Sequence, residues 1–124
     1  MDILKVRSHQ REELVEITEL VQEKLSESEA QEGMVLLYVQ HTTAGLTVNE
    51  NADPDVPRDM LHALRTLIPQ HGMGFRHGEE NSDAHIKASL TGPSVTILSK
   101  MESCCWDVGK ESFFASSMVD VNVR

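Results

Sequence analysis

The sequence predicts an α+β fold: one compact domain over residues 1–124, mainly antiparallel sheet or sandwich, with two main helices and one short helix. Three observations lead to this prediction. A chain of 124 residues has the usual size of one domain and can bury one hydrophobic core. Apolar segments of strand length recur along the chain, together with amphipathic segments of helical periodicity. Because aromatic residues make up only 4% of the chain, we expect a core of Leu, Val, Ile and Met.

Five segments have the length and composition of strands. Met1–Arg7 alternates polar and apolar residues, and Met34–Val39 is a continuous apolar run that predicts burial on both faces. Leu46–Val48 and Val95–Leu98 are short and rich in β-branched residues. Phe113–Val123 is expected to form one closing strand, because valines alternate with polar residues along its second half.

The first predicted helix covers Arg11–Ser26. Its apolar residues are spaced by 3, 4 and 4 positions and therefore share one face: Leu14, Ile17, Val21 and Leu25. Glutamates crowd its first turns, where we expect them to be solvated and to face the positive end of the helix dipole.

The second predicted helix has a defined start and end. Asp53 is expected to cap its N-terminus, Pro54 to occupy the first helical position and Pro69 to terminate it. Between them runs an apolar stripe: Val56, Met60, Leu64, Leu67 and Ile68. Asp59 lies at the edge of this stripe.

A short third helix is predicted over His85–Leu90. Ser82 or Asp83 could cap its start, and Gly92-Pro93 closes it. His85 would then lie in the first turn, where the positive end of the helix dipole favours a neutral imidazole, the form that binds metals.

The composition argues against two classes of partner. A net charge of -9, with only eleven scattered Lys and Arg residues, does not fit a nucleic-acid binder, which needs clustered basic residues. The chain has neither a run of 18 apolar residues nor an apolar segment near its start, so we expect no membrane partner and a cytoplasmic location.

The adjacent Cys104 and Cys105 are expected to be reduced thiols, at least one of them packed as a small hydrophobic side chain.

Two polar segments, His41–Asp59 and His77–His85, lie between the apolar elements. Each places histidine beside carboxylates and hydroxyls at the end of an apolar strand or helix, where binding sites are often built. If His41, His77 and His85 converge, their imidazoles would make a zinc-type site with one position open for water or substrate.

Carboxylates in the same segments could orient an imidazole or act as a general base: Glu50, Asp53, Asp59 and Glu79. Each candidate also has a structural interpretation. A single histidine in a loop is usually solvated, Asp53 is more readily a helix cap, and Asp59 is more often a solvated charge on a helix flank. Spacing alone leaves both interpretations open.

The two polar segments are similar to a known family. His41–Met60 reads HTTAGLTVNENADPDVPRDM and His77–Ser94 reads HGEENSDAHIKASLTGPS. Both resemble the YjbQ-type family, often labelled secondary thiamine-phosphate synthases. The resemblance implies one YjbQ-like α+β domain over residues 1–124, a homotrimer, and a pocket near the subunit interface.

By residue-level match, the resemblance points to seven residues. Among them we expect His41, His77 and His85 to be metal ligands and Glu50, Asp59, Glu79 and Asn81 to be catalytic residues. The implied activity is that of a weak thiamine-phosphate synthase-type transferase. Such an enzyme joins hydroxymethylpyrimidine diphosphate to a thiazole phosphate and releases pyrophosphate. The implied partner is thus a small phosphorylated molecule, and a divalent metal (Zn or Mg) could neutralise the leaving group.

One part of the chain departs from the family pattern. Members usually carry Gly-x-Trp-Gln and then Asp-Gly-Pro-Arg near the last strands, and neither is recognisable in Cys105–Ser117. This departure motivates an alternative function, a non-catalytic trimer that binds a metal or a phosphorylated ligand. A third possibility, metal-assisted hydrolysis of a phosphate or amide, rests only on the general chemistry of histidine and carboxylate sites.

Overall fold

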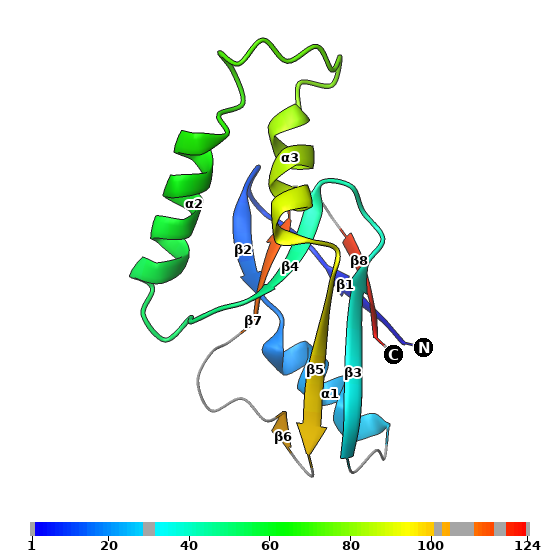
Figure 1. The fold of residues 1–124 in the computed structure, drawn as a ribbon. Coiled ribbons are helices and arrows are strands. Elements are labelled where there is room, and N and C mark those ends of the chain that lie inside the picture. Colours follow the sequence, from blue (N-terminus) through cyan, green and yellow to red (C-terminus); the bar gives the residue numbers. More distant parts are fainter. Residues whose placement is uncertain (1, 29–31, 101–102, 105–110, 116–118, 124) are drawn as a thin grey trace.

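The computed structural model describes residues 2–28, 32–100, 103–104, 111–115 and 119–123. Its strands form two sheets (Figure 1). The larger has the strand order β1-β8-β3-β5-β6 and the smaller has the order β2-β7-β4. The strand pairs are antiparallel, and helices pack around them, so the predicted α+β fold with an antiparallel sheet is confirmed.

The elements in chain order are β1 (Asp2–Val6), β2 (Glu13–Glu16), α1 (Thr18–Glu27), β3 (Glu32–Val39), β4 (Ala44–Val48), α2 (Asp55–Leu67), α3 (Ser82–Thr91), β5 (Ser94–Lys100), β6 (Ser103–Cys104), β7 (Glu111–Ala115) and β8 (Val119–Val123). The predicted strands at the start of the chain and at residues 46–48 and 95–98 correspond to β1, β4 and β5. Among the described residues, no helix is both long enough and apolar enough to cross a bilayer.

The described core is aliphatic, as predicted, although none of its members is a methionine. It joins residues from both sheets and from α1: Leu4, Val6, Ile17, Val21, Val35, Leu37, Val39, Ala44, Leu46 and Ile97. The prediction that β3 is buried on both faces is wrong, because only alternate residues point into this core. Met34, Leu36 and Tyr38 point the other way and are exposed. An antiparallel strand with one packed face produces this alternation.

The prediction of one helix over Arg11–Ser26 is also wrong in its first half. Glu13–Glu16 forms β2, which pairs antiparallel with β7, and α1 begins only at Thr18. Ile17 and Val21 still share the buried face that their spacing predicts. The preceding residues instead satisfy their backbone groups by pairing with a strand almost a hundred positions away, and this tertiary contact outweighs the local helical pattern.

The second helix begins one residue later than predicted, because Pro54 occupies the N-cap position and Asp55 is the first helical residue. Asp53 contributes a side-chain hydrogen bond to that residue, whose backbone N–H donates to Asp53 Oδ1 at 2.9 Å. Helix α2 ends at Leu67, shortly before Pro69. The predicted apolar stripe is only partly covered: Leu67 is exposed, whereas Ile68 is buried.

The third helix starts earlier than predicted, at Ser82, and is closed as predicted by Gly92, which has φ +89°. Its C-terminal end packs closely on β4. A Cβ at Gly45 would lie 1.9 Å from Thr91 Oγ1, so only glycine allows this contact. The Leu46 N–H also donates to the Gly92 carbonyl at 2.9 Å.

The predicted single strand Phe113–Val123 is in fact two strands that belong to different sheets. β7 lies between β2 and β4, whereas β8 lies between β1 and β3. The chain therefore crosses from the small sheet to the large one within a segment whose pattern predicts one continuous strand. Cys104 lies in β6 of the large sheet. Cys105 lies outside the described residues.

Candidate functional site

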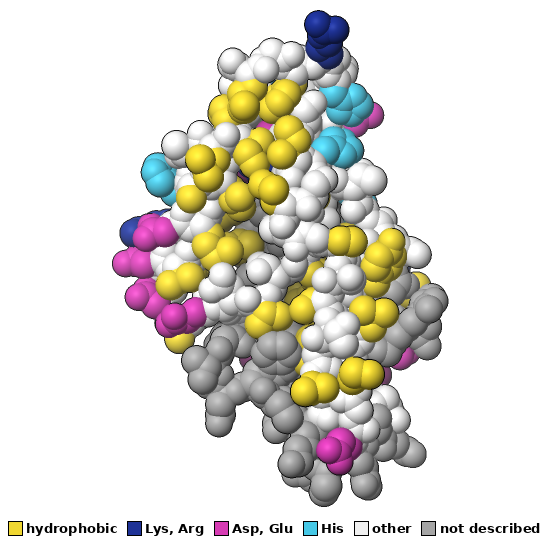
Figure 2. Space-filling view, in the orientation of Figure 1, with side chains coloured by type: hydrophobic (Ala, Val, Ile, Leu, Met, Phe, Trp, Pro, Cys, Tyr) yellow, Lys and Arg dark blue, Asp and Glu magenta, His cyan; other side chains and the backbone are white. Residues whose placement is uncertain are grey.

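Four of the predicted site residues come together at the start of α3. We call His77, Glu79, Asn81 and His85 the histidine cluster. The ring centroids of His77 and His85 are 5.5 Å apart, with an interplanar angle of 71°. His77 Nε2 lies 3.8 Å from Glu79 Oε2, and Asn81 Nδ2 donates to the same carboxylate oxygen at 3.2 Å. Histidine and acidic side chains gather beside α3 in the space-filling view (Figure 2).

A turn in front of α3 explains this grouping. The Glu80 N–H donates to the His77 carbonyl at 3.1 Å, and Glu80 has a left-handed backbone with φ +55°. The Asn81 carbonyl then accepts from the His85 N–H at 3.3 Å, in the first turn of the helix. The turn thus folds His77 back over the helix start, where His85 projects. A residue outside the turn also stabilises it: Gln70 Nε2 donates a hydrogen bond to the Glu80 carbonyl at 3.2 Å.

The Asn81 side chain has an unusual arrangement. Its Nδ2 is engaged with Glu79, but its Oδ1 is buried and has no hydrogen-bond partner in the described part of the chain. Asn81 occupies the N-cap position of α3 without making a side-chain cap hydrogen bond. A buried amide oxygen without a donor is uncommon and costly.

His41 lies at a different place, immediately after β3. Its Nδ1 is 3.0 Å from Thr43 Oγ1, and Thr43 is buried. His41 also lines a cavity of about 440 Å³ with Tyr38, Val39, Gln40, Thr42 and Pro93. Within the described residues of one chain, no three His, Cys, Asp or Glu side chains gather in a way that could hold a metal ion.

The remaining two candidates are exposed. Asp59 projects from α2 and pairs with Arg58, at 3.2 Å between Arg58 Nη2 and Asp59 Oδ1. Glu50 is exposed in the segment after β4, and its backbone N–H donates to Asn49 Oδ1 at 2.8 Å. Their catalytic role therefore stays a prediction, without a structural contact to the histidine cluster.

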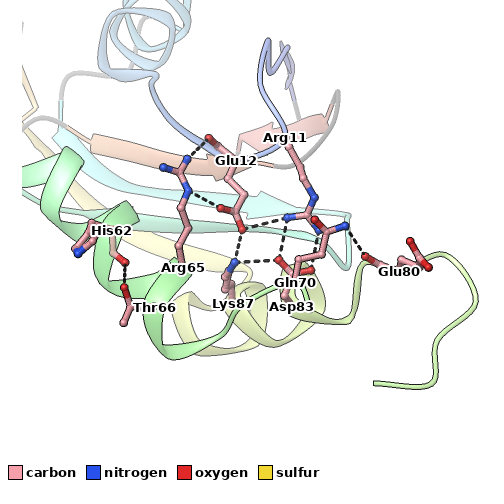
Figure 3. A network of polar contacts seen from close by, with 9 residues as sticks. All are labelled: Arg11, Glu12, His62, Arg65, Thr66, Gln70, Glu80, Asp83 and Lys87. Carbon is pink, nitrogen blue, oxygen red and sulfur yellow. Dashed lines mark hydrogen bonds and ion pairs between the residues drawn. The ribbon is translucent and has the colours of Figure 1, made fainter. Parts of the chain in front are cut away.

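Figure 3 shows a second group of polar side chains, which was not predicted from the sequence. We call its five members the ion-pair cluster: Arg11, Glu12, Arg65, Asp83 and Lys87. Arg11 forms a bidentate pair with Asp83, at 2.9 and 2.8 Å, and Lys87 Nζ lies 3.0 Å from Asp83 Oδ2. Glu12 binds Lys87, and it also accepts from Arg65 Nε at 2.7 Å. The cluster joins the segment before β2 to α2 and α3.

Two expectations are corrected by this cluster. Asp83 does not cap α3; it lies in the first turn of the helix, and its side chain is fully buried. Glu12 is also buried, although the sequence predicts that the glutamates in this segment are solvated. The hydrogen bonds from Arg11 hold the pKa of Asp83 well below its ordinary value, and the hydrogen bond from Lys87 acts in the same direction. The only sequence signal was the spacing of Asp83 and Lys87 by four positions, which places them on one helix face.

The chain is similar to known proteins over most of its length. Residues 2–107 match the profile of the family described as UPF0047 protein YjbQ-like. The UPF0047 protein MJ1081 of Methanocaldococcus jannaschii is 50% identical over 96 residues, which cover 77% of this chain and 69% of that protein. The UPF0047 protein YugU of Bacillus subtilis is 41% identical over 95 residues, which cover 77% of this chain and 72% of that protein.

Solved structures agree with the sequence matches. A yjbq/upf0047 family protein from Clostridium acetobutylicum superimposes with a TM-score of 0.93 at 35% identity, covering 100% of this chain and 98% of that one. The conserved hypothetical protein TT1486 from Thermus thermophilus superimposes with a TM-score of 0.91 at 36% identity, with the same coverage. The chain therefore belongs to the YjbQ-like UPF0047 family.

Proposed function

We propose that this chain binds a small phosphorylated molecule at the histidine cluster, and that the reaction there is a thiamine-phosphate synthase-type transfer. The observation that carries the proposal is the pairing of His77 and His85, with ring centroids 5.5 Å apart and the Glu79 carboxylate beside one ring. Two adjacent imidazoles on an accessible surface can donate N–H groups to phosphate oxygens or transfer protons.

In the proposed transfer, the thiazole nitrogen forms a bond to the methylene carbon of the pyrimidine, and the bond from that carbon to the diphosphate breaks. Negative charge develops on the departing pyrophosphate, and the N–H groups of His77 and His85 stabilise it. Asn81 holds Glu79 through its amide, and Glu79 orients His77.

The mechanism assigns no step to a metal held by the protein, and the Mg²⁺ supplied in the test would enter with the diphosphate substrate. In the described part of a single chain, the candidate ligands do not gather into a three-ligand site, so a metal held by His41, His77 and His85 would need ligands from another copy. A homotrimer with sites at subunit interfaces is part of our proposal. Exposed apolar side chains on the outer face of β3 and β5 support subunit contact there: Met34, Leu36, Tyr38 and Leu98.

The direct test is product formation. Purified protein is incubated with hydroxymethylpyrimidine diphosphate, the thiazole phosphate and Mg²⁺, and thiamine phosphate and pyrophosphate are quantified. We expect His85→Ala to lower the rate by about 10²–10³-fold, the usual contribution of one hydrogen-bond donor to developing negative charge. The matched control is His62→Ala, an exposed histidine on α2 that is outside the cluster. Wild-type product no greater than that of His85→Ala would refute the transferase proposal.

A second candidate function is a non-catalytic trimer that binds a metal or a phosphorylated ligand. The observation that favours it is the absence of the family's Trp-Gln and Asp-Gly-Pro-Arg motifs from residues 105–117. Native mass spectrometry and elemental analysis test it, because they report the number of subunits and any bound metal or ligand together. A monomer that carries neither would contradict this candidate.

A further inference from the structure

The ion-pair cluster consists of two layers. The inner layer contains Asp83, Lys87 and Glu12, whose side chains are 0%, 1% and 7% exposed. The outer layer contains the guanidinium groups of Arg11 and Arg65, whose side chains are 42% and 52% exposed. A ligand that approaches from solvent therefore meets the cations first, because the carboxylates lie beneath them.

The charges within the cluster do not cancel. Arg11, Arg65 and Lys87 contribute three positive charges, whereas Glu12 and Asp83 contribute two negative charges. The cluster therefore carries one excess positive charge, within a chain whose net charge is -9. Both carboxylates already accept hydrogen bonds from cations. Glu12 Oε1 accepts from Lys87 and Arg11, and Glu12 Oε2 accepts from Arg65. Asp83 accepts from Arg11 and Lys87.

Each guanidinium group of the outer layer has a nitrogen that makes no hydrogen bond to the described residues. Arg65 donates through Nε and Nη2, both to Glu12, and its Nη1 has no partner among the described residues. Arg11 donates through Nη1 and Nη2, and its Nε is likewise unengaged in that part of the chain. A guanidinium has five N–H groups in a planar fork that suits carboxylate and phosphate oxygens.

A cavity lies against this cluster. It has a volume of about 330 Å³ and is lined by Gln10, Arg11, Glu12, Arg65, Pro69, Gln70 and Lys87. This volume is at the lower end of the range for small-molecule sites and is sufficient for a phosphate or carboxylate with a small attached group. Three of the seven lining side chains are cations, and two more are amides that can donate hydrogen bonds.

We propose that this cavity is an oxyanion-binding site, in which Arg11 and Arg65 bind the phosphate or carboxylate group of a small molecule and the buried Lys87 adds positive charge behind them. The site is distinct from the histidine cluster, because Lys87 and His85 are two positions apart on α3 and therefore project from nearly opposite faces of the helix. The proposal does not depend on the transferase activity proposed above.

The test is isothermal titration calorimetry of the full chain with inorganic phosphate, malonate and chloride at constant ionic strength. We expect phosphate or malonate to bind with a heat that chloride does not reproduce. Binding of phosphate alone would assign a phosphorylated ligand, and binding of malonate alone would assign a carboxylate ligand. No heat from either anion beyond that of chloride would overturn the proposal.

Substitutions test where on the protein the anion binds. Arg65→Gln removes an outer cation and leaves the inner layer of Lys87 and the two carboxylates in place, and we expect at least about tenfold weaker binding. Arg58→Gln is the matched control, because it makes the same charge change on the same helix but on a residue that pairs with Asp55 and Asp59 and does not line the cavity. Equal affinity of the two variants would overturn the proposal. Loss of binding in His85→Ala would also overturn it, because the anion would then occupy the histidine cluster.

Discussion

The histidine cluster and the ion-pair cluster both include side chains of α3, and His85 of the first projects from a nearly opposite face to Asp83 and Lys87 of the second. In the histidine cluster the side chains are exposed or half-buried, and their contacts are 3.2 Å or longer. In the ion-pair cluster two carboxylates and an ammonium are buried, and several of their hydrogen bonds are 3.0 Å or shorter. The comparison teaches that one helix can present loosely held, accessible groups on one face and a tightly paired charge network on the other.

The largest expected effect comes from breaking the buried network. Lys87→Met should lower the free energy of unfolding by about 3 kcal/mol, because each of two buried carboxylates loses one cation and keeps only its arginine partner. Urea unfolding followed by circular dichroism measures the change. The matched control is Lys24→Met, which removes a more exposed lysine paired with Glu27, and its midpoint should stay close to wild type. Similar midpoints for the two variants would show that the network does not stabilise the fold.

A smaller loss is expected where α3 meets β4. Gly45→Ala should cost about 1–3 kcal/mol, because the new Cβ would overlap Thr91 and crowd the Gly92 carbonyl. Gly33→Ala is the matched control, since nothing lies within 4 Å of a Cβ at that position. Thermal unfolding of both variants checks the prediction. A Gly45→Ala protein as stable as Gly33→Ala would show that the helix does not need this close contact.

The pH dependence of stability distinguishes the clusters further. The pKa of Asp83 is lowered in the folded state, chiefly by the hydrogen bonds from Arg11. Its contribution to stability is therefore present above the ordinary carboxyl pKa of 3.8 and is lost as the pH falls below that value. Urea unfolding between pH 7 and pH 3 should show a steeper loss for wild type than for Asp83→Asn. Parallel curves would contradict a charged, paired Asp83.

The smallest effect on stability is expected in the histidine cluster. His85→Ala should change the free energy of unfolding by less than about 1 kcal/mol, because the side chain is half-buried and forms no salt bridge with the other described residues. Chemical unfolding beside wild type gives the value. A loss comparable to that of Lys87→Met would mean that this cluster is structural, contrary to the proposed function.

The local sequence pattern was sufficient to predict those helices and strands whose structure depends on residues nearby in the sequence. The end of α2 before Pro69, the closure of α3 by Gly92 and the strand at residues 94–100 follow from such signals. Local pattern failed for β2, because Leu14 and Ile17 fit a helical stripe and the partner strand β7 lies almost a hundred residues away. The sequence of a segment does not contain information about such a distant partner.

The grouping of residues in the candidate site was predictable to a similar extent. His77, Glu79, Asn81 and His85 are close in sequence, so their grouping follows from one turn and the first turn of α3. The ion-pair cluster could not be predicted in the same way, because Glu12 and Lys87 are 75 positions apart. Charged residues are normally assigned to the surface, and only tertiary structure shows which of them are buried with their partners.

The most direct test of the account is a nuclear magnetic resonance titration of the six histidine rings with hydroxymethylpyrimidine diphosphate. If the histidine cluster is the ligand site, the ring signals of His77 and His85 should shift on binding, and the His62 signal should stay in place. The shift of the His77 signal should be lost in His85→Ala. Unchanged signals for His77 and His85 at saturating ligand, or equal shifts of all six rings, would contradict the central claim.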